Sequence, residues 1–247
     1  LQPDEILCKT TLEILSILKY YHYPFVLSTK SDLILNQNYL DLIIQTPSSI
    51  QISFSTLNDR LAHRLEPNAP SPSDRLKVLK LLSKNNVYTV ARIQPFLCGI
   101  ESVSKRQLMK ISETGVKHVV FEHIRIPTNS SKKIRDKLWN AIGINLLDFF
   151  KKEGLKVSRV SYELNSRKKL KNILRTKKIV NDLGMTFGSG DNDFHHFSDH
   201  LCCCGIPNTI EFKNIYNGHL GYGIYNALRT GKVSFDYIQK FWHPVGS

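Results

Sequence analysis

Short apolar segments that are typical of buried strands recur along the chain, with helical patterns between them. The segments are residues 25–29, 50–56, 87–96, 116–124, 157–160 and 186–188. Most of them begin roughly 25 to 35 residues after the preceding one, which is the spacing of βα units in a parallel sheet. We therefore expect an α/β protein whose right-handed crossovers form either a barrel or an open doubly wound sheet.

The absence of glycine-rich nucleotide-binding signatures favours the barrel over the doubly wound sheet. Gly188-Ser189-Gly190 lacks the third glycine and the following helix of a dinucleotide-binding fingerprint, and the sequence contains no P-loop. We expect a barrel-like domain over residues 1–205. A small aromatic and glycine-rich extension at 206–247 is expected to pack on this barrel.

Polar and charged residues lie where the expected strands end. In a parallel barrel these ends meet at one mouth, where active sites form. A mouth that carries both signs of charge suits a charged small molecule. The candidates are Thr29, Lys30, Ser31, Ser55, Thr56, Arg92, Gln94, Glu122, His123, Arg125, Tyr162, Glu163, Asp191, Asn192 and Asp193.

The chain is basic, with 34 Lys and Arg against 21 Asp and Glu, a net charge of +13. This balance favours partners that carry phosphate, although a basic surface also serves solubility. The basic run at 167–178 is either a nucleic-acid footprint or the solvated face of an amphipathic helix. The amphipathic helix is the more common of the two.

Five cysteines, an odd number, do not form the framework of a disulfide-rich secreted protein. No apolar run reaches the roughly 18 to 20 residues that span a bilayer, and the first residues lack a signal-peptide pattern. We expect a cytoplasmic protein without membrane contact.

Four short segments follow one another in a set order. They are Thr29-Lys30-Ser31, Ser53-Phe54-Ser55-Thr56, Glu66-Pro67 with Arg75-Leu76, and Arg92 to Pro95. This set resembles the radical S-adenosylmethionine enzymes, specifically the spore photoproduct lyase-like group. That group carries a Thr-Lys pair at the end of one strand, a serine at the end of the next, and a Glu-Pro loop before a helix bearing Arg-Leu.

The resemblance implies a partial (β/α)6 TIM-type barrel that uses S-adenosylmethionine and a [4Fe–4S] cluster to generate a 5′-deoxyadenosyl radical for hydrogen abstraction. It implies a lyase-like enzyme that acts in DNA repair on a nucleic acid substrate, with an external electron donor such as ferredoxin or flavodoxin. Lys30 and Ser55 would hold the methionine end or the ribose of the cofactor. Arg92, Gln94 and Glu122 would make further polar contacts with it.

The cysteines depart from the family pattern. Its members bind the cluster through C-x-x-x-C-x-x-C, whereas here Cys8 and Cys98 stand alone and Cys202, Cys203 and Cys204 are adjacent. Adjacent side chains are expected to point in different directions, so we assign no metal ligand in this chain. The missing triad is expected upstream of Leu1. The chain is then either an N-terminally truncated piece of an active enzyme, which we favour, or a natural remnant that has lost the cluster.

The segment at 191–204 is dense in Asp, His and Cys. Three interpretations stay open: a polar loop that closes the barrel mouth, a second metal or cluster site, or a cysteine that donates a hydrogen atom in the radical reaction. For the last, the candidates are Cys203 and Cys204.

Two other functions remain as alternatives. One is a non-catalytic basic α/β protein that binds nucleic acid and has lost the cluster. The other is a barrel enzyme that acts on a phosphorylated small molecule.

Overall fold

The computed structural model describes residues 4–100, 104–200, 202–206 and 220–240. The chain divides into two units, Leu1–Gly205 and Ile206–Ser247, and each is described by itself.

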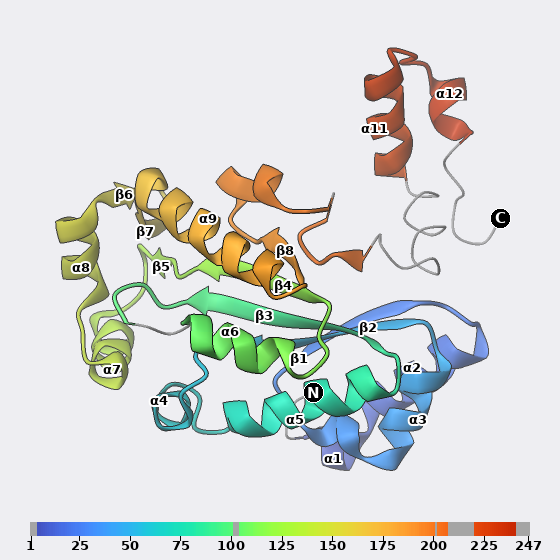
Figure 1. The fold of residues 1–247 in the computed structure, drawn as a ribbon, viewed down its shortest axis with the longest axis horizontal. Coiled ribbons are helices and arrows are strands. Elements are labelled where there is room, and N and C mark those ends of the chain that lie inside the picture. Colours follow the sequence, from blue (N-terminus) through green and yellow to red (C-terminus); the bar gives the residue numbers. More distant parts are fainter. Residues whose placement is uncertain (1–3, 101–103, 201, 207–219, 241–247) are drawn as a thin grey trace. The chain divides into compact units, whose positions relative to one another are not determined.

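A parallel five-stranded sheet forms the centre of the first unit, in the order β1-β2-β3-β4-β8 (Figure 1). The register pairs Leu27 with Ile50, Ile52 with Ala91, and Val119 with Phe187. The strands are β1 (Phe25–Thr29), β2 (Ser48–Phe54), β3 (Tyr88–Phe96), β4 (His118–His123) and β8 (Thr186–Ser189).

Helices follow the strands and are capped by polar side chains that the sequence places at their first turns. Ser104 and Gln107 form a capping box at the start of α6, and Asn165 accepts a hydrogen bond from the Lys168 backbone at the start of α9. The helices of this unit are α1 (Glu5–Cys8), α2 (Thr10–Tyr20), α3 (Gln37–Gln45), α4 (Asp59–Leu65), α5 (Pro72–Lys84), α6 (Lys105–Ser112), α7 (Lys132–Ile142), α8 (Leu146–Glu153) and α9 (Ser166–Asp182), with the 3-10 turns η1 (Leu33–Leu35) and η2 (Asn192–Phe197).

The two faces of the sheet differ in polarity because side chains alternate along each strand. Ile52, Ile93 and Phe121 are fully buried in the hydrophobic core, to which α5, α6 and α9 contribute apolar side chains. The opposite face carries polar residues, among them Gln51 and Arg92. This second face is where the polar side chains predicted from the sequence are brought together.

The expected fifth strand at 157–160 is wrong. Val157 ends the short strand β6 (Leu155–Val157), and residues 158–160 are the turn of an antiparallel hairpin to β7 (Ser161–Leu164). This hairpin belongs to a separate three-stranded sheet with β5 (Ile126–Pro127). Val157 and Val160 are 60% and 74% exposed, so these apolar residues do not mark a buried strand. Within the described residues the main sheet therefore has five strands rather than six and stays open.

The apolar spacing over 130–153 predicts one long amphipathic helix that ends at Gly154, but this helix is interrupted. Gly143 adopts a left-handed φ of 80° and ends α7, after which Asn145 caps α8. The end of the second helix at Gly154 is as predicted.

The second unit contains α11 (Leu220–Thr230) and α12 (Phe235–Gln239), which contact one another. Much of the expected aromatic extension, including Phe212, Tyr216 and Trp242, lies outside the described residues. Its packing on the barrel stays a prediction. In the part of the chain that the structure describes, every helix is too short or too polar to cross a membrane.

Two glycines that end helices offer a test of the fold. Gly154→Ala should destabilise the first unit more than Gly143→Ala, although both positions have positive φ. A methyl at Gly143 meets open space and adds only the left-handed strain of about 1 to 2 kcal/mol. A methyl at Gly154 would lie 1.9 Å from Nδ2 of Asn165 and displace the cap of α9, which costs about 1 kcal/mol more. Urea unfolding of both variants measures the difference; equal losses would contradict this role for Asn165.

Candidate functional site

Glu66 brings together two of the residues predicted from the sequence. Its Oε1 accepts hydrogen bonds from Lys30 Nζ at 2.6 Å and from the hydroxyl of Ser55. Its Oε2 pairs with Arg75 Nη2 at 2.7 Å. The sequence placed Glu66 and Arg75 in the motif but did not assign them to the site.

Arg75 fixes the position of this carboxylate. The side chain is only 1% exposed, and its other nitrogens donate to the carbonyls of Pro70 and Ser53, each at 2.9 Å. Ser71 caps α5, so that Arg75 lies in the first turns of the helix and reaches back to the loop that precedes it. The 66–70 loop is thereby held against the end of β2.

The electrostatics of Glu66 favour its charged form. Burial alone would raise the pKa of Glu66, but the hydrogen bonds from Lys30, Ser55 and Arg75 outweigh burial and hold that pKa below its usual range. A carboxylate therefore persists here at neutral pH, beside a lysine whose side chain is 38% exposed.

A cavity of about 930 Å³ opens beside this cluster. The end of β1 and the 66–70 loop form most of its wall. The residues that line the cavity include Ser28, Lys30, Ser53 and Glu66.

The other three predicted cofactor residues, Arg92, Gln94 and Glu122, form a polar row on the face of the sheet opposite the hydrophobic core. Arg92 Nε donates to Gln94 Oε1 at 3.0 Å, and the Gln94 amide donates to Glu122. Arg92 Nη1 also donates to Gln51 Oε1 at 2.9 Å and to Ser28 Oγ at 3.1 Å. Because Ser28 also lines the cavity, the row and the Glu66 cluster adjoin at that residue.

Glu122 differs from Glu66 in its electrostatics. Burial raises the pKa of Glu122, and the opposing charge of Arg125, 3.4 Å away, does not cancel this effect.

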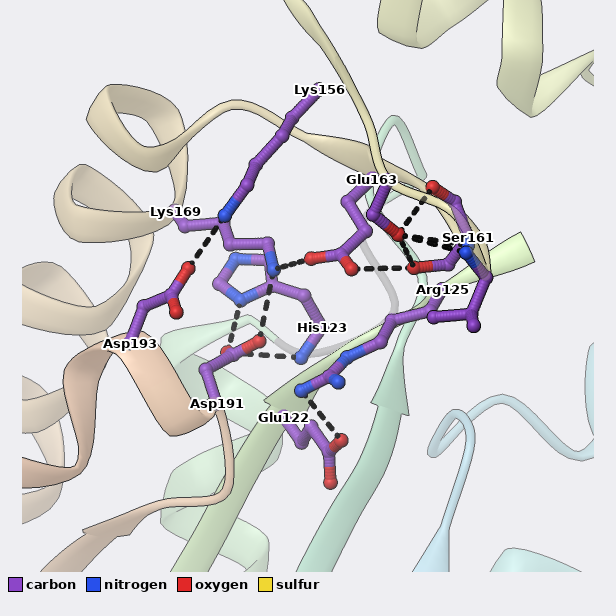
Figure 2. A network of polar contacts seen from close by, with 11 residues as sticks. Glu122, His123, Arg125, Lys156, Ser161, Glu163, Lys169, Asp191 and Asp193 are labelled. Atoms are coloured by element: carbon purple, nitrogen blue, oxygen red, sulfur yellow. Dashed lines mark hydrogen bonds and ion pairs between the residues drawn. The ribbon is translucent and has the colours of Figure 1, made fainter. Parts of the chain in front are cut away.

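A second charged network lies at the ends of β4 and β8 (Figure 2). Lys169, buried on α9, pairs with Glu163 at 2.7 Å and with Asp191 at 3.3 Å, and Asp191 accepts a bond from His123 at 2.7 Å. Burial alone would raise the pKa of Asp191, but His123 and Lys169 hold it below its ordinary value. The sequence placed His123, Glu163 and Asp191 at the mouth, whereas Lys169 was hidden inside the basic run.

The three adjacent cysteines converge, contrary to the expectation that their side chains point apart. The sulfurs of Cys202, Cys203 and Cys204 all lie within 4.8 Å of one another, and those of Cys203 and Cys204 are 3.7 Å apart. Hydrogen bonds from the two neighbouring thiols, aided by the charge of Arg92, lower the pKa of Cys204. The cysteine cluster therefore lies beside the polar row.

Comparisons with known proteins agree with this architecture. A scan against protein-family models and a search of curated proteins found no match. Among solved structures, a mutant spore photoproduct lyase with bound AdoMet and dinucleoside spore photoproduct matches with a TM-score of 0.52 and 12% identity, over 73% of this chain and 55% of that one. The lyase complexed with the dinucleoside spore photoproduct matches with a TM-score of 0.51 and 14% identity over the same shares.

This chain has a partial TIM-type fold similar to that of spore photoproduct lyase. The resemblance stated from the sequence is thus confirmed for the fold. The chain spans about 55% of the length of the lyase structures that it matches.

The described cysteines do not fit the [4Fe–4S] cluster of that family. Cys8 is exposed at the end of α1 and Cys98 is buried next to β3. The three remaining sulfurs are as close as ligands of one metal ion, whereas the thiolates of a cluster bind different irons and lie farther apart.

Glu66→Gln should destabilise the first unit by about 3 kcal/mol at pH 7, because it leaves the buried Arg75 without a charged partner. The pKa of Glu66 is lowered on folding, so its contribution is complete above the unfolded value of about 4.3 and is lost as pH falls through the folded pKa. The variant should therefore lose less stability than the wild type on acidification below about pH 4.3.

Urea unfolding between neutral and acidic pH measures both effects. Asp148→Asn, which alters an exposed surface pair, is the matched control and should change little. The same pH dependence in Glu66→Gln and the wild type would show that Glu66 is not held ionised by this cluster.

Proposed function

We propose that the first unit binds S-adenosylmethionine in the 930 Å³ cavity as part of a radical S-adenosylmethionine enzyme. The observation that carries the proposal is the ion pair of Lys30 and Glu66 at the wall of this cavity, with the hydroxyl of Ser55 donating to the same carboxylate. The size is within the range of about 300 to 1,000 Å³ that small-molecule sites occupy.

The charges of the cluster complement those of the cofactor. S-adenosylmethionine carries a carboxylate, an ammonium group and a sulfonium. Lys30, whose ammonium group is partly exposed, suits the carboxylate, and the ionised Glu66 suits the two cationic groups. The hydroxyl of Ser55 and the polar row around Arg92, Gln94 and Glu122 supply partners for the amino end and the ribose.

The radical chemistry of this class is supplied by the cofactor together with a [4Fe–4S] cluster. Because the described cysteines do not fit that cluster, we propose that residues other than these cysteines bind it. The role proposed for this chain is to bind and orient S-adenosylmethionine. A redox protein such as ferredoxin or flavodoxin is the proposed electron donor.

A nucleic acid is the proposed substrate of the whole enzyme, with lyase-like DNA repair as the activity. The lyase structures hold a dinucleoside photoproduct, and this chain has a net charge of +13. Arg167, Lys171 and Arg175 form an exposed stripe at i, i+4 and i+8 on α9.

The non-catalytic nucleic-acid-binding alternative receives less support. Several lysines of the basic run are used inside the unit. Lys168 pairs with Glu153 at 2.5 Å, Lys177 pairs with Asp199 at 2.6 Å, and Lys169 is buried. These contacts support a role of the run in the amphipathic helix α9 rather than a nucleic-acid footprint along its whole length.

Binding of S-adenosylmethionine to the chain should be measurable by calorimetry without the cluster. Lys30→Ala should weaken the affinity at least about tenfold, because it removes the charged partner of the carboxylate. Ser55→Ala should weaken it less. Lys77→Ala, which removes an exposed lysine of α5, should leave the affinity unchanged.

Cys203 and Cys204 are candidates for hydrogen donation and not for cofactor binding. Calorimetry therefore tests the binding of S-adenosylmethionine apart from catalysis. Undetectable affinity in a folded wild-type chain, or equal losses in Lys30→Ala and Lys77→Ala, would contradict the proposed site.

The nucleic-acid proposal predicts a salt-dependent affinity for DNA oligonucleotides. Lys171→Glu with Arg175→Glu should weaken binding and lower the slope of log affinity against log salt by about 2, since each removed cation contributes about one unit. Fluorescence anisotropy at several salt concentrations measures this slope. Lys133→Glu on α7 is the control, and an affinity independent of salt in the wild type would remove the proposal.

A further inference from the structure

The Cys202, Cys203 and Cys204 thiols form a cluster that the binding of S-adenosylmethionine does not use. All three sulfurs lie within 4.8 Å of one another. The three thiols are free rather than disulfide-bonded, and their residues are only partly buried. Solvent and small ions can therefore reach them.

Hydrogen bonds hold the backbone of this segment against the sheet. His118 Nε2 contacts the carbonyl of Cys203 at 2.7 Å, and Nδ1 of the same ring contacts Thr186 Oγ1 at 2.7 Å. Tyr88 donates its hydroxyl to the carbonyl of Gly205 at 3.2 Å. These contacts to His118 and Tyr88 hold the backbone in the conformation in which the three sulfurs converge.

The absence of a side chain at position 188 permits this docking. A Cβ at Gly188 would lie 1.9 Å from the carbonyl oxygen of Cys203. The backbone of β8 and the cysteine segment therefore approach each other at a distance that only glycine allows.

We propose that Cys202, Cys203 and Cys204 bind one thiophilic metal ion of the zinc type, with a fourth position open to water or another ligand. Zinc binds thiolates at about 2.3 Å in tetrahedral geometry, which places two sulfurs about 3.8 Å apart. The Sγ atoms of Cys203 and Cys204 are 3.7 Å apart, which fits two ligands of a single ion.

The surroundings of the cluster fit an anionic metal–thiolate centre. Three thiolates and a divalent cation carry one net negative charge, and Arg92 lies close enough to Cys204 to act on it electrostatically. Gln51 lies beside the same cysteine; the residue is 1% exposed, and its side chain interacts with the thiol of Cys204. The buried amide of Gln51 suits the outer shell of a metal-bound sulfur.

The backbone provides another donor of this kind. The N–H of Cys204 points to the sulfur of Cys202 at 3.4 Å. Such a contact stabilises a thiolate more than a neutral thiol, because the acceptor then carries charge.

The test is a titration of the reduced, chelator-treated full chain with Co²⁺, a spectroscopic substitute for zinc. One equivalent should produce a thiolate-to-cobalt absorption band, and Zn²⁺ should abolish the band by displacement. Cys202→Ser, Cys203→Ser and Cys204→Ser should each weaken binding at least about tenfold, and the triple variant should show no band.

Cys8→Ser and Cys98→Ser are the matched controls, since they remove the two cysteines outside the cluster. Both should keep the band and the stoichiometry. Circular dichroism and urea unfolding check that each variant is folded, and the affinity for S-adenosylmethionine, measured separately, tells failure of this site from failure of the proposed function.

Several results would overturn the proposal. They are the lack of a band in the folded wild type, a band that survives in the triple variant, or reconstitution of an iron–sulfur cluster that requires these three cysteines. Ready alkylation of Cys203 or Cys204 without metal affinity would also overturn it, and would favour the hydrogen-donor role that the sequence suggested for them.

Discussion

The buried ion pair between Arg75 and Glu66 is the interaction on which the candidate site depends. A buried guanidinium must have its donors satisfied, and Arg75 bonds to Glu66, to the end of β2 at Ser53 and to Pro70 in the loop. These acceptors belong to two segments that are separate in the sequence, the 66–70 loop and the end of β2. The pair therefore fixes both the wall of the cavity and the carboxylate that Lys30 and Ser55 contact.

The alternation of side chains along the strands explains why polar residues gather on the other side of the core. Ile50 and Ile52 need one apolar face, so Gln51 must point to the opposite face. In the parallel register Ser28 lies beside Gln51, and Arg92 lies beside Ser53 on the next strand. A row of polar groups follows from the same pattern that builds the core.

The sequence predicted the parts of this molecule that depend on local patterns. The strands of the main sheet and the helix end at Gly154 were of this kind. The hairpin around Val157 and Val160 was misread because exposure is not visible in a run of apolar residues. Its short strands pair with each other and with β5, and no local signal distinguishes them from a strand of the main sheet.

Local patterns also indicated some residues of the candidate site and missed others. Lys30, Ser55, Arg92, Gln94 and Glu122 could be selected because strand ends meet at one edge of a parallel sheet. The roles of Glu66 and Arg75 depend on a loop that folds back onto β2, and Lys169 serves an interior network although it lies in a basic run. Such contacts depend on how the 66–70 loop and α9 fold back onto neighbouring strands, and composition alone does not reveal them.

The cysteine segment shows where a local rule ceases to apply. In a strand, Cys203 would point away from Cys202 and Cys204, but these residues lie in a turn that reaches Gly205 with a φ of 67°. The turn allows three consecutive sulfurs to converge, and His118 holds it in place. Arg92 then acts on Cys204 on one side and bonds to Ser28 at the cavity on the other. A single side chain, Arg92, thus lies between the thiols and the wall of the cavity.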